Sequence, residues 1–118
     1  MAQIMKRIST HVLDLVRGKP AVAVGVRLEK QNGSGTWQVL GSSQTDQDGR
    51  CPQLLPQDDA LVAGAYRLTF ETGDYFALQK IATLYTVVEV TFRAQEGESH
   101  FHIPLLLSPN GYTTYRGS

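Results

Sequence analysis

The histidines and arginines supply the side chains of this sequence that are best suited to acid–base chemistry near neutral pH. His100 and His102 are separated by a single residue, while His11 lies near the start of the chain. A histidine has its ordinary pKa near neutrality, so its neutral form can take a proton from water. An arginine remains charged and can hold a developing oxyanion. Because the sequence contains no nucleophile elbow and no phosphate-binding glycine loop, these groups favour activation of water without a covalent intermediate.

The end of the sequence adds further polar groups in the run Tyr115-Arg116-Gly117-Ser118. A chain terminus is normally the least constrained part of a domain. Here it carries the guanidinium of Arg116, the conformationally flexible Gly117 and the hydroxyl of Ser118 beside a carboxylate. Such a tail can bring several polar groups to one place.

A metal centre is an alternative use of the histidines. His11, His100 and His102 could form a zinc site with an open position, because alternate residues of a strand project from the same face. No carboxylate or cysteine spacing in the sequence supports such a site. We therefore predict that the protein uses no metal and no other cofactor.

The elements that must position these residues show an alternation of apolar and polar side chains with a period of two, which is typical of half-buried strands. The helix signal is confined to residues 72–83, where Asp74 stands near the start and Lys80 near the end of a run of helix-forming residues. The clearest alternation covers residues 22–30, 66–71, 88–93 and 100–107, and weaker strands are predicted over residues 8–15, 37–45 and 111–116.

Seven or eight short strands at close spacing predict an all-β fold, an antiparallel β-sandwich of two sheets with one short helix. The length of 118 residues leaves room for one core only, so we expect a single domain over residues 1–118.

The strand over residues 100–107 has an unusual outer face. If Phe101, Ile103 and Leu105 point into the sandwich, then His100 and His102 point out of it together with apolar Pro104 and Leu106. An apolar outer face indicates a surface that another subunit or a ligand covers. The alternative is a pair of histidines exposed on an ordinary surface.

The charge and composition of the sequence restrict the kinds of molecule that the protein is expected to bind and the compartment in which it is expected to occur. Eleven basic and eleven acidic residues cancel, so the sequence predicts no binding of nucleic acid and no attraction to an anionic membrane. No apolar run follows Lys6 and Arg7, so we expect no signal peptide, and no stretch is long enough to cross a membrane. The single cysteine, Cys51, is expected to be a small buried residue in a reducing compartment. A cytoplasmic location is therefore predicted.

The sequence contains the stretches Ser9-Thr10-His11-Val12-Leu13-Asp14, Asp48-Gly49-Arg50-Cys51-Pro52, the run from Phe101 to Pro109 and Tyr115-Arg116-Gly117-Ser118. Together these stretches resemble the transthyretin-related 5-hydroxyisourate hydrolases, and the resemblance extends over nearly the whole chain. The terminal Tyr-Arg-Gly-Ser is the most specific of them, because hormone-carrying transthyretins do not end in this way. The sequence departs from the family pattern at Tyr85-Thr86, where an aromatic-Pro pair is common, and at Phe76, where a tryptophan is common.

The resemblance implies hydrolysis of 5-hydroxyisourate to 2-oxo-4-hydroxy-4-carboxy-5-ureidoimidazoline in urate breakdown. It also implies a homotetramer with active sites in a channel where subunits meet. Family members occur in cytoplasm, periplasm and peroxisome, so the resemblance leaves the compartment open. The alternative function is a non-catalytic carrier that holds a small ligand in the same channel. By resemblance the catalytic residues are His11, Arg50, His102 and Ser118, and Tyr115 and Arg116 are substrate-binding residues that position the tail, whereas His100 lies outside the set.

Overall fold

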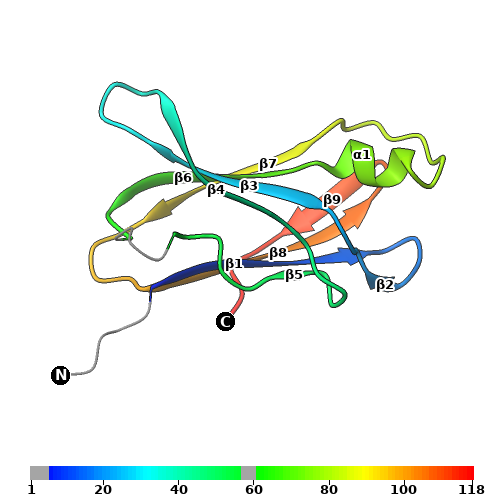
Figure 1. Cartoon of the computed structure of the whole chain (residues 1–118), viewed down its shortest axis with the longest axis horizontal. Coiled ribbons are helices and arrows are strands. Elements are labelled where there is room, and N and C mark those ends of the chain that lie inside the picture. Colours follow the sequence, from blue (N-terminus) through cyan, green and yellow to red (C-terminus); the bar gives the residue numbers. More distant parts are fainter. Residues whose placement is uncertain (1–5, 57–60) are drawn as a thin grey trace.

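Nine strands and one short helix make up the part of the chain described by the computed structural model, which covers residues 6–56 and 61–118. The strands form two layers that face each other, and the helix lies at one end of them (Figure 1). In chain order the elements are β1 (Arg7–Asp14), β2 (Lys19–Pro20), β3 (Gly25–Gln31), β4 (Trp37–Gln44), β5 (Arg50–Cys51), β6 (Gly64–Phe70), α1 (Thr72–Ala77), β7 (Val88–Ala94), β8 (His100–Ser108) and β9 (Gly111–Thr114).

The first sheet has the order β2-β1-β8-β9 with β5 paired to β1, and the second has the order β4-β3-β6-β7. The predicted antiparallel sandwich with one short helix is confirmed. The described residues form nine strands instead of the expected seven or eight, because β2 and β5 have only two residues each, too few for an alternating pattern to show. One strand pair differs from its neighbours, because β1 and β8 run parallel from Arg7↔His100 to Asp14↔Leu107. The alternation of side chains is the same for either strand direction, so the period of two could not reveal this pair.

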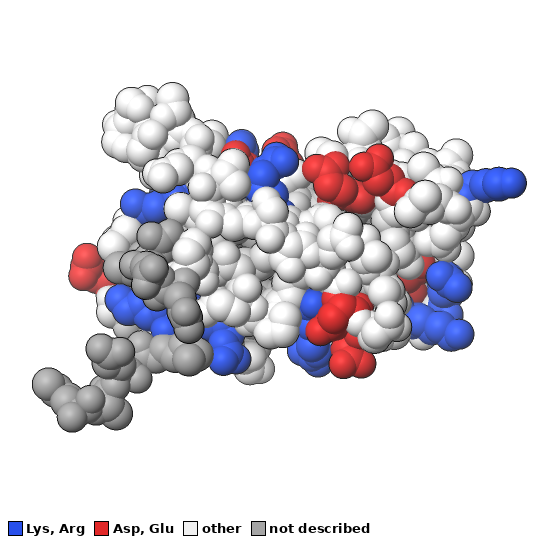
Figure 2. Space-filling view, in the orientation of Figure 1, with Lys and Arg blue, Asp and Glu red and all other residues white. Residues whose placement is uncertain are grey.

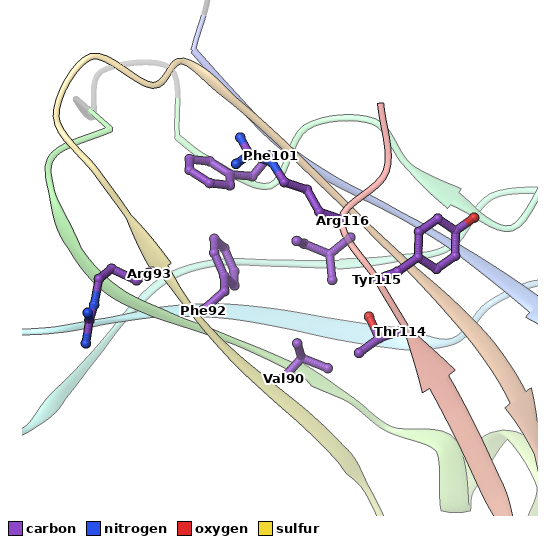
Figure 3. A pocket seen from close by; sticks show the side chains of 8 residues that line it. Val90, Phe92, Arg93, Phe101, Thr114, Tyr115 and Arg116 are labelled. Carbon is purple, nitrogen blue, oxygen red and sulfur yellow. The ribbon is translucent and has the colours of Figure 1, made fainter.

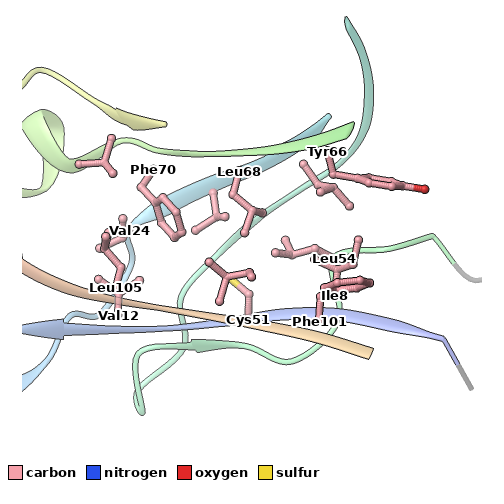
Figure 4. Packing of buried hydrophobic residues seen from close by; sticks show 14 of the residues in the cluster. Ile8, Val12, Val24, Cys51, Leu54, Tyr66, Leu68, Phe70, Phe101 and Leu105 are labelled. Atoms are coloured by element: carbon pink, nitrogen blue, oxygen red, sulfur yellow. The ribbon is translucent and has the colours of Figure 1, made fainter. Parts of the chain in front are cut away.

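The core lies between the two sheets and consists of the inward side chains of the alternating strands. Figure 4 shows Val12, Leu105 and Cys51 of the first sheet facing Leu68 and Phe70 of the second, and all five are almost fully buried. Burying one large apolar side chain stabilises the fold by about 1.5–3 kcal/mol. Cys51 is buried as predicted, and burial raises the pKa of its thiol.

The helix is shorter than the segment 72–83 that carried its sequence signal. It is anchored by the buried side chains of Tyr75 and Phe76, and it ends at Ala77. Beyond it the backbone turns, and Lys80 has a positive φ of 59°, which does not continue a right-handed helix. Thr86, where the sequence departs from the family pattern, is hydrogen-bonded to this helix. Its carbonyl oxygen accepts a hydrogen bond from Gly73 N.

The arrangement of β1, β5 and β8 places the predicted chemical groups on one outer face. The parallel pairing sets Ser9 opposite His102, and the antiparallel pairing of β5 with β1 sets Arg50 opposite His11. In β8 Phe101, Ile103 and Leu105 are buried, as predicted from the alternation. His102 therefore points away from the core.

The surface agrees with the neutral composition. Basic and acidic side chains are interspersed on the face shown in Figure 2. Among the described residues no helix is long and apolar enough to cross a membrane.

Candidate active site

A polar pocket of about 320 Å³ opens on the outer face of β1, β5 and β8. Three of the four predicted catalytic residues line it, namely Arg50, His102 and Ser118. His11 is not among its lining residues but lies beside it, opposite Arg50 in the strand pairing. Among residues 6–56 and 61–118, the pocket is lined by Arg7, Ser9, Thr10, Arg50, Pro52, His100, His102 and Ser118.

His102 is half-buried, and its ring is fixed by one short contact: Nδ1 lies 2.8 Å from Ser9 Oγ. Burial lowers the pKa of His102, and the nearby charges of Arg50, His100 and His11 lower the pKa further. The lowered pKa favours the neutral imidazole, which can accept a proton. This is the state that a general base for water requires.

His11 is oriented by the turn that precedes β5. Its Nε2 lies 2.8 Å from the carbonyl oxygen of Asp48. Because a carbonyl oxygen only accepts hydrogen bonds, Nε2 must carry the hydrogen, and Nδ1 is the nitrogen with the lone pair when the ring is neutral. His11 is thus held in one tautomer at the edge of the pocket.

The same turn fixes the position of Arg50. Asp46 Oδ1 accepts hydrogen bonds from the backbone N–H groups of Asp48 and Arg50, both at 2.9 Å. Gly49 has a φ of 76°, and a Cβ there would lie 2.4 Å from the carbonyl oxygen of Val12. Glycine allows β5 to approach β1 this closely, so that the exposed Arg50 reaches the pocket.

The tail reaches the pocket by resuming the pairing of β9 with β8. Regular pairing stops at Leu105↔Thr114 and resumes as the single bridge His102↔Gly117, on either side of Pro104, which has no backbone N–H to offer. Gly117 N donates to the carbonyl oxygen of His102 at 2.8 Å. A Cβ on Gly117 would lie 2.5 Å from His102 Cδ2, so the tail backbone packs directly against the imidazole.

Gly117→Ala is therefore expected to displace either the tail or the His102 ring and to lower turnover about tenfold or more, since small misplacements of catalytic groups are costly. Steady-state kinetics would measure the loss. Gly33→Ala is the matched control, because no atom lies within 4 Å of a Cβ placed there. Equal turnover in the two variants would show that the packing against His102 has no catalytic importance.

Arg116 does not line the polar pocket. Its guanidinium makes an ion pair of 2.9 Å with Glu98, donates to the carbonyl oxygen of His100 at 3.3 Å and lies 4.6 Å from the centre of the Phe101 ring. Figure 3 shows the guanidinium beside that ring. These contacts anchor the tail. They are compatible with the predicted role of Arg116 in positioning the tail, and Arg116 is not among the residues that line the polar pocket.

Tyr115 is also outside the polar pocket, and its side chain is 55% exposed. Tyr115 and Arg116 line a different, mostly apolar pocket of about 200 Å³ between β7 and the tail. The structure therefore separates the two predicted substrate-binding residues from the group formed by Arg50, His102 and Ser118.

Sequence reasoning missed Ser9, Arg7 and Glu98. The alternation of β1 carries a signal for two of them, because Arg7, Ser9 and His11 fall on the same face of a strand. Glu98 lies in the turn between β7 and β8, where no periodic pattern indicates its partner. The zinc alternative gains no support, because among residues 6–56 and 61–118 no three His, Cys, Asp or Glu side chains are grouped as metal ligands.

The chain is similar to known proteins both in sequence and in structure. The model of the HIUase/Transthyretin family matches residues 8–117. A 5-hydroxyisourate hydrolase of Salmonella dublin is 45% identical over 111 residues, which cover 94% of this chain and 80% of the relative. The solved structure of the Klebsiella pneumoniae 5-hydroxyisourate hydrolase is 38% identical, with a TM-score of 0.83 over 97% of this chain and all of that one. Sea bream transthyretin in complex with thyroxine is 33% identical, with a TM-score of 0.88 over 94% of each chain.

Proposed function

The chain belongs to the HIUase/Transthyretin family, and we propose that it hydrolyses 5-hydroxyisourate by activating water at the pocket of His102. The observation that carries this mechanism is that half-buried His102 and the permanently charged Arg50 line one polar pocket, where burial lowers the pKa of the histidine. These are the two groups needed to generate a hydroxide equivalent and to stabilise the negative charge formed by its attack.

The first step adds water to a ring amide carbonyl of the substrate. His102 takes one proton from the water as its oxygen forms a bond to the carbonyl carbon. The carbonyl π electrons move to oxygen, and Arg50 faces the resulting oxyanion. Because Arg50 carries its charge before the reaction begins, the stabilisation requires no proton transfer at that group.

In the second step the tetrahedral intermediate collapses. The carbon–nitrogen bond of the six-membered ring breaks, and the leaving nitrogen takes the proton that His102 received. The carbonyl carbon becomes a carboxyl group, giving 2-oxo-4-hydroxy-4-carboxy-5-ureidoimidazoline. His102 returns to its neutral state, so no cofactor or covalent intermediate is needed in this sequence of steps.

His11 and Ser118 complete the proposed catalytic set. His11 presents Nδ1 as an acceptor when neutral, which suits the binding of a substrate N–H or of the water. Ser118 lines the pocket and offers a hydroxyl to the same groups. Arg116 acts indirectly, by anchoring the tail through Glu98.

The carrier alternative is less well supported. The fold does not separate the two functions, since sea bream transthyretin and the Klebsiella hydrolase both superpose on the chain. The curated relatives with 38–45% identity over most of the chain include several named 5-hydroxyisourate hydrolases. The polar lining of the pocket also suits a polar ring that reacts with water better than an apolar ligand.

A direct assay tests the activity. 5-Hydroxyisourate is generated from urate, and its decay is followed spectroscopically with and without the purified protein. Acceleration that increases in proportion to protein concentration supports the proposal. A decay rate independent of the protein would exclude hydrolysis of this substrate and favour the carrier.

The pH dependence of the reaction is predicted from the lowered pKa of His102. A base with a lowered pKa keeps its neutral form to lower pH, so kcat/KM should fall on the acid side with a midpoint below about 6.5, the ordinary value for histidine. A pH–rate profile measures this midpoint. An acid limb centred above the ordinary value would contradict the environment described for His102.

We propose that the protein is a homotetramer with dihedral symmetry whose subunits meet across the face of His102, Leu106 and the tail. On this face Leu106 of β8 is only half-buried. Other apolar side chains are also exposed in the single chain, among them Leu84 at 67% and Leu15 and Val16 at 56% each. The chain has no net charge to keep copies apart. Light scattering at micromolar concentration should give four times the mass of one chain, and a monomer would contradict the proposal.

A cytoplasmic location is proposed as well. The buried free thiol of Cys51 is compatible with a reducing compartment. Cell fractionation with an antibody against the protein would test it.

A further inference from the structure

The contact between Ser9 and His102 connects the proposed base to a residue without an assigned role. Ser9 Oγ lies 2.8 Å from His102 Nδ1, and Ser9 is only 7% exposed. The two residues are opposite each other in the parallel pairing of β1 and β8. Each is therefore held by a strand of the same sheet, and their separation is set by the backbone rather than by a flexible loop.

The other side of the ring is also restricted. The tail backbone at Gly117 packs against Cδ2, so the ring has little room to rotate away from Ser9. With Nδ1 engaged by the hydroxyl, Nε2 is the nitrogen left to act on water. A neutral imidazole can accept a proton at Nε2 only if its hydrogen is on Nδ1.

We propose that Ser9 is a positioning residue that accepts the hydrogen of His102 Nδ1 and thereby presents the lone pair of Nε2 to the pocket. This inference rests on the proposed function, in which His102 is the base for water. Ser9 acts through His102 and needs no contact with the substrate.

The neutral character of Ser9 is part of the inference. A carboxylate in this position would hold the imidazolium by charge and delay release of its proton to the leaving nitrogen. The charged and titratable groups around His102 are Arg7 and His11 of β1, Arg50 of β5, His100 of β8 and the terminal Ser118. A hydroxyl fixes the ring among these groups without adding a negative charge.

Kinetics of two substitutions test the role of the hydroxyl. Ser9→Ala should lower kcat by about ten- to a hundredfold with KM nearly unchanged, because the imidazole hydrogen is then distributed over both ring nitrogens. Ser9→Thr keeps the hydroxyl and should restore most of kcat. Ser42→Ala, which removes an exposed serine from β4 of the other sheet, is the matched control. An unchanged kcat in Ser9→Ala would overturn the proposal.

A spectroscopic measurement tests the tautomer without using activity. In histidine labelled with ¹⁵N, two-bond ¹H–¹⁵N correlations distinguish a nitrogen that carries hydrogen from one that does not, and His102→Asn identifies the signals. The native protein should show hydrogen on Nδ1, and Ser9→Ala should show a mixture. Hydrogen on Nε2 in the native protein would overturn the inference.

The two measurements separate this inference from the proposed function. If the native protein fails to hydrolyse 5-hydroxyisourate while the spectra show the Nδ1 tautomer set by Ser9, the substrate assignment fails and the positioning contact stands. If the native protein is active but Ser9→Ala has native kcat and a native tautomer, the function stands and the role of Ser9 is wrong.

Discussion

Replacing His102 by asparagine is expected to lower the turnover of 5-hydroxyisourate by roughly two or more orders of magnitude, the usual scale for loss of a general acid–base group. Asparagine keeps a polar side chain but cannot take a proton from water. Arg50→Gln should cause a loss of similar size, because the oxyanion then lacks its charged partner. Initial rates at saturating substrate measure both effects.

The stability of these variants should remain close to that of the native protein. Arg50 is exposed and His102 is only half-buried, and neither belongs to the hydrophobic core. Thermal unfolding would verify that lost activity is not lost folding. His11→Asn should show a loss comparable to that of His102→Asn if it binds substrate or water at the same pocket.

His100→Asn is the internal comparison for this series. His100 shares the outer face of β8 with His102 and also lines the pocket, but it is exposed and the proposed mechanism assigns it no step. The variant should retain most of its turnover. A larger loss in His100→Asn than in His102→Asn would show that the wrong histidine has been assigned as the base.

Deleting Arg116 to Ser118 is expected to reduce turnover as severely as loss of His102, by roughly two orders of magnitude. When residues act as one catalytic unit, removing part of the unit costs about as much activity as removing all of it. The deletion removes Ser118 from the pocket and the Gly117 backbone from the His102 ring. It also removes the ion pair with Glu98 that anchors the tail.

The sandwich should remain folded after this deletion. The buried core contains no residue from 116 to 118, and the pairing of β8 with β9 ends before them at Thr114. Circular dichroism and the thermal midpoint should stay near the native values, apart from a small loss where Arg116 covers the Phe101 ring. Full turnover in the deletion variant would exclude the tail from the active site.

Elements of the fold were predictable where a local pattern decides them. Alternation places Phe101, Ile103 and Leu105 on one face of β8 and His102 on the other, because successive side chains of a strand point to opposite sides. The helix was predicted in the right place but too long, since propensity does not register the positive φ of Lys80 or the tertiary contacts that end it.

The candidate catalytic residues were named from the sequence by resemblance, and their residue types alone indicated the chemistry of water activation. Alternation also showed that His100 and His102 share an outer face. It did not show that Arg50 reaches that face, because this depends on a two-residue strand placed by the turn at Asp46 and Gly49.

Tertiary structure alone decided how these groups meet. The parallel direction of β1 and β8 sets Ser9 opposite His102, and the return of the tail beside β8 brings Gly117 against the imidazole and Arg116 to Glu98. Residues 9 and 102 are joined by strand register, which is a property of long-range pairing. A period of two is identical for parallel and antiparallel neighbours, so local sequence determines which side chains share a face and pairing determines which of them touch.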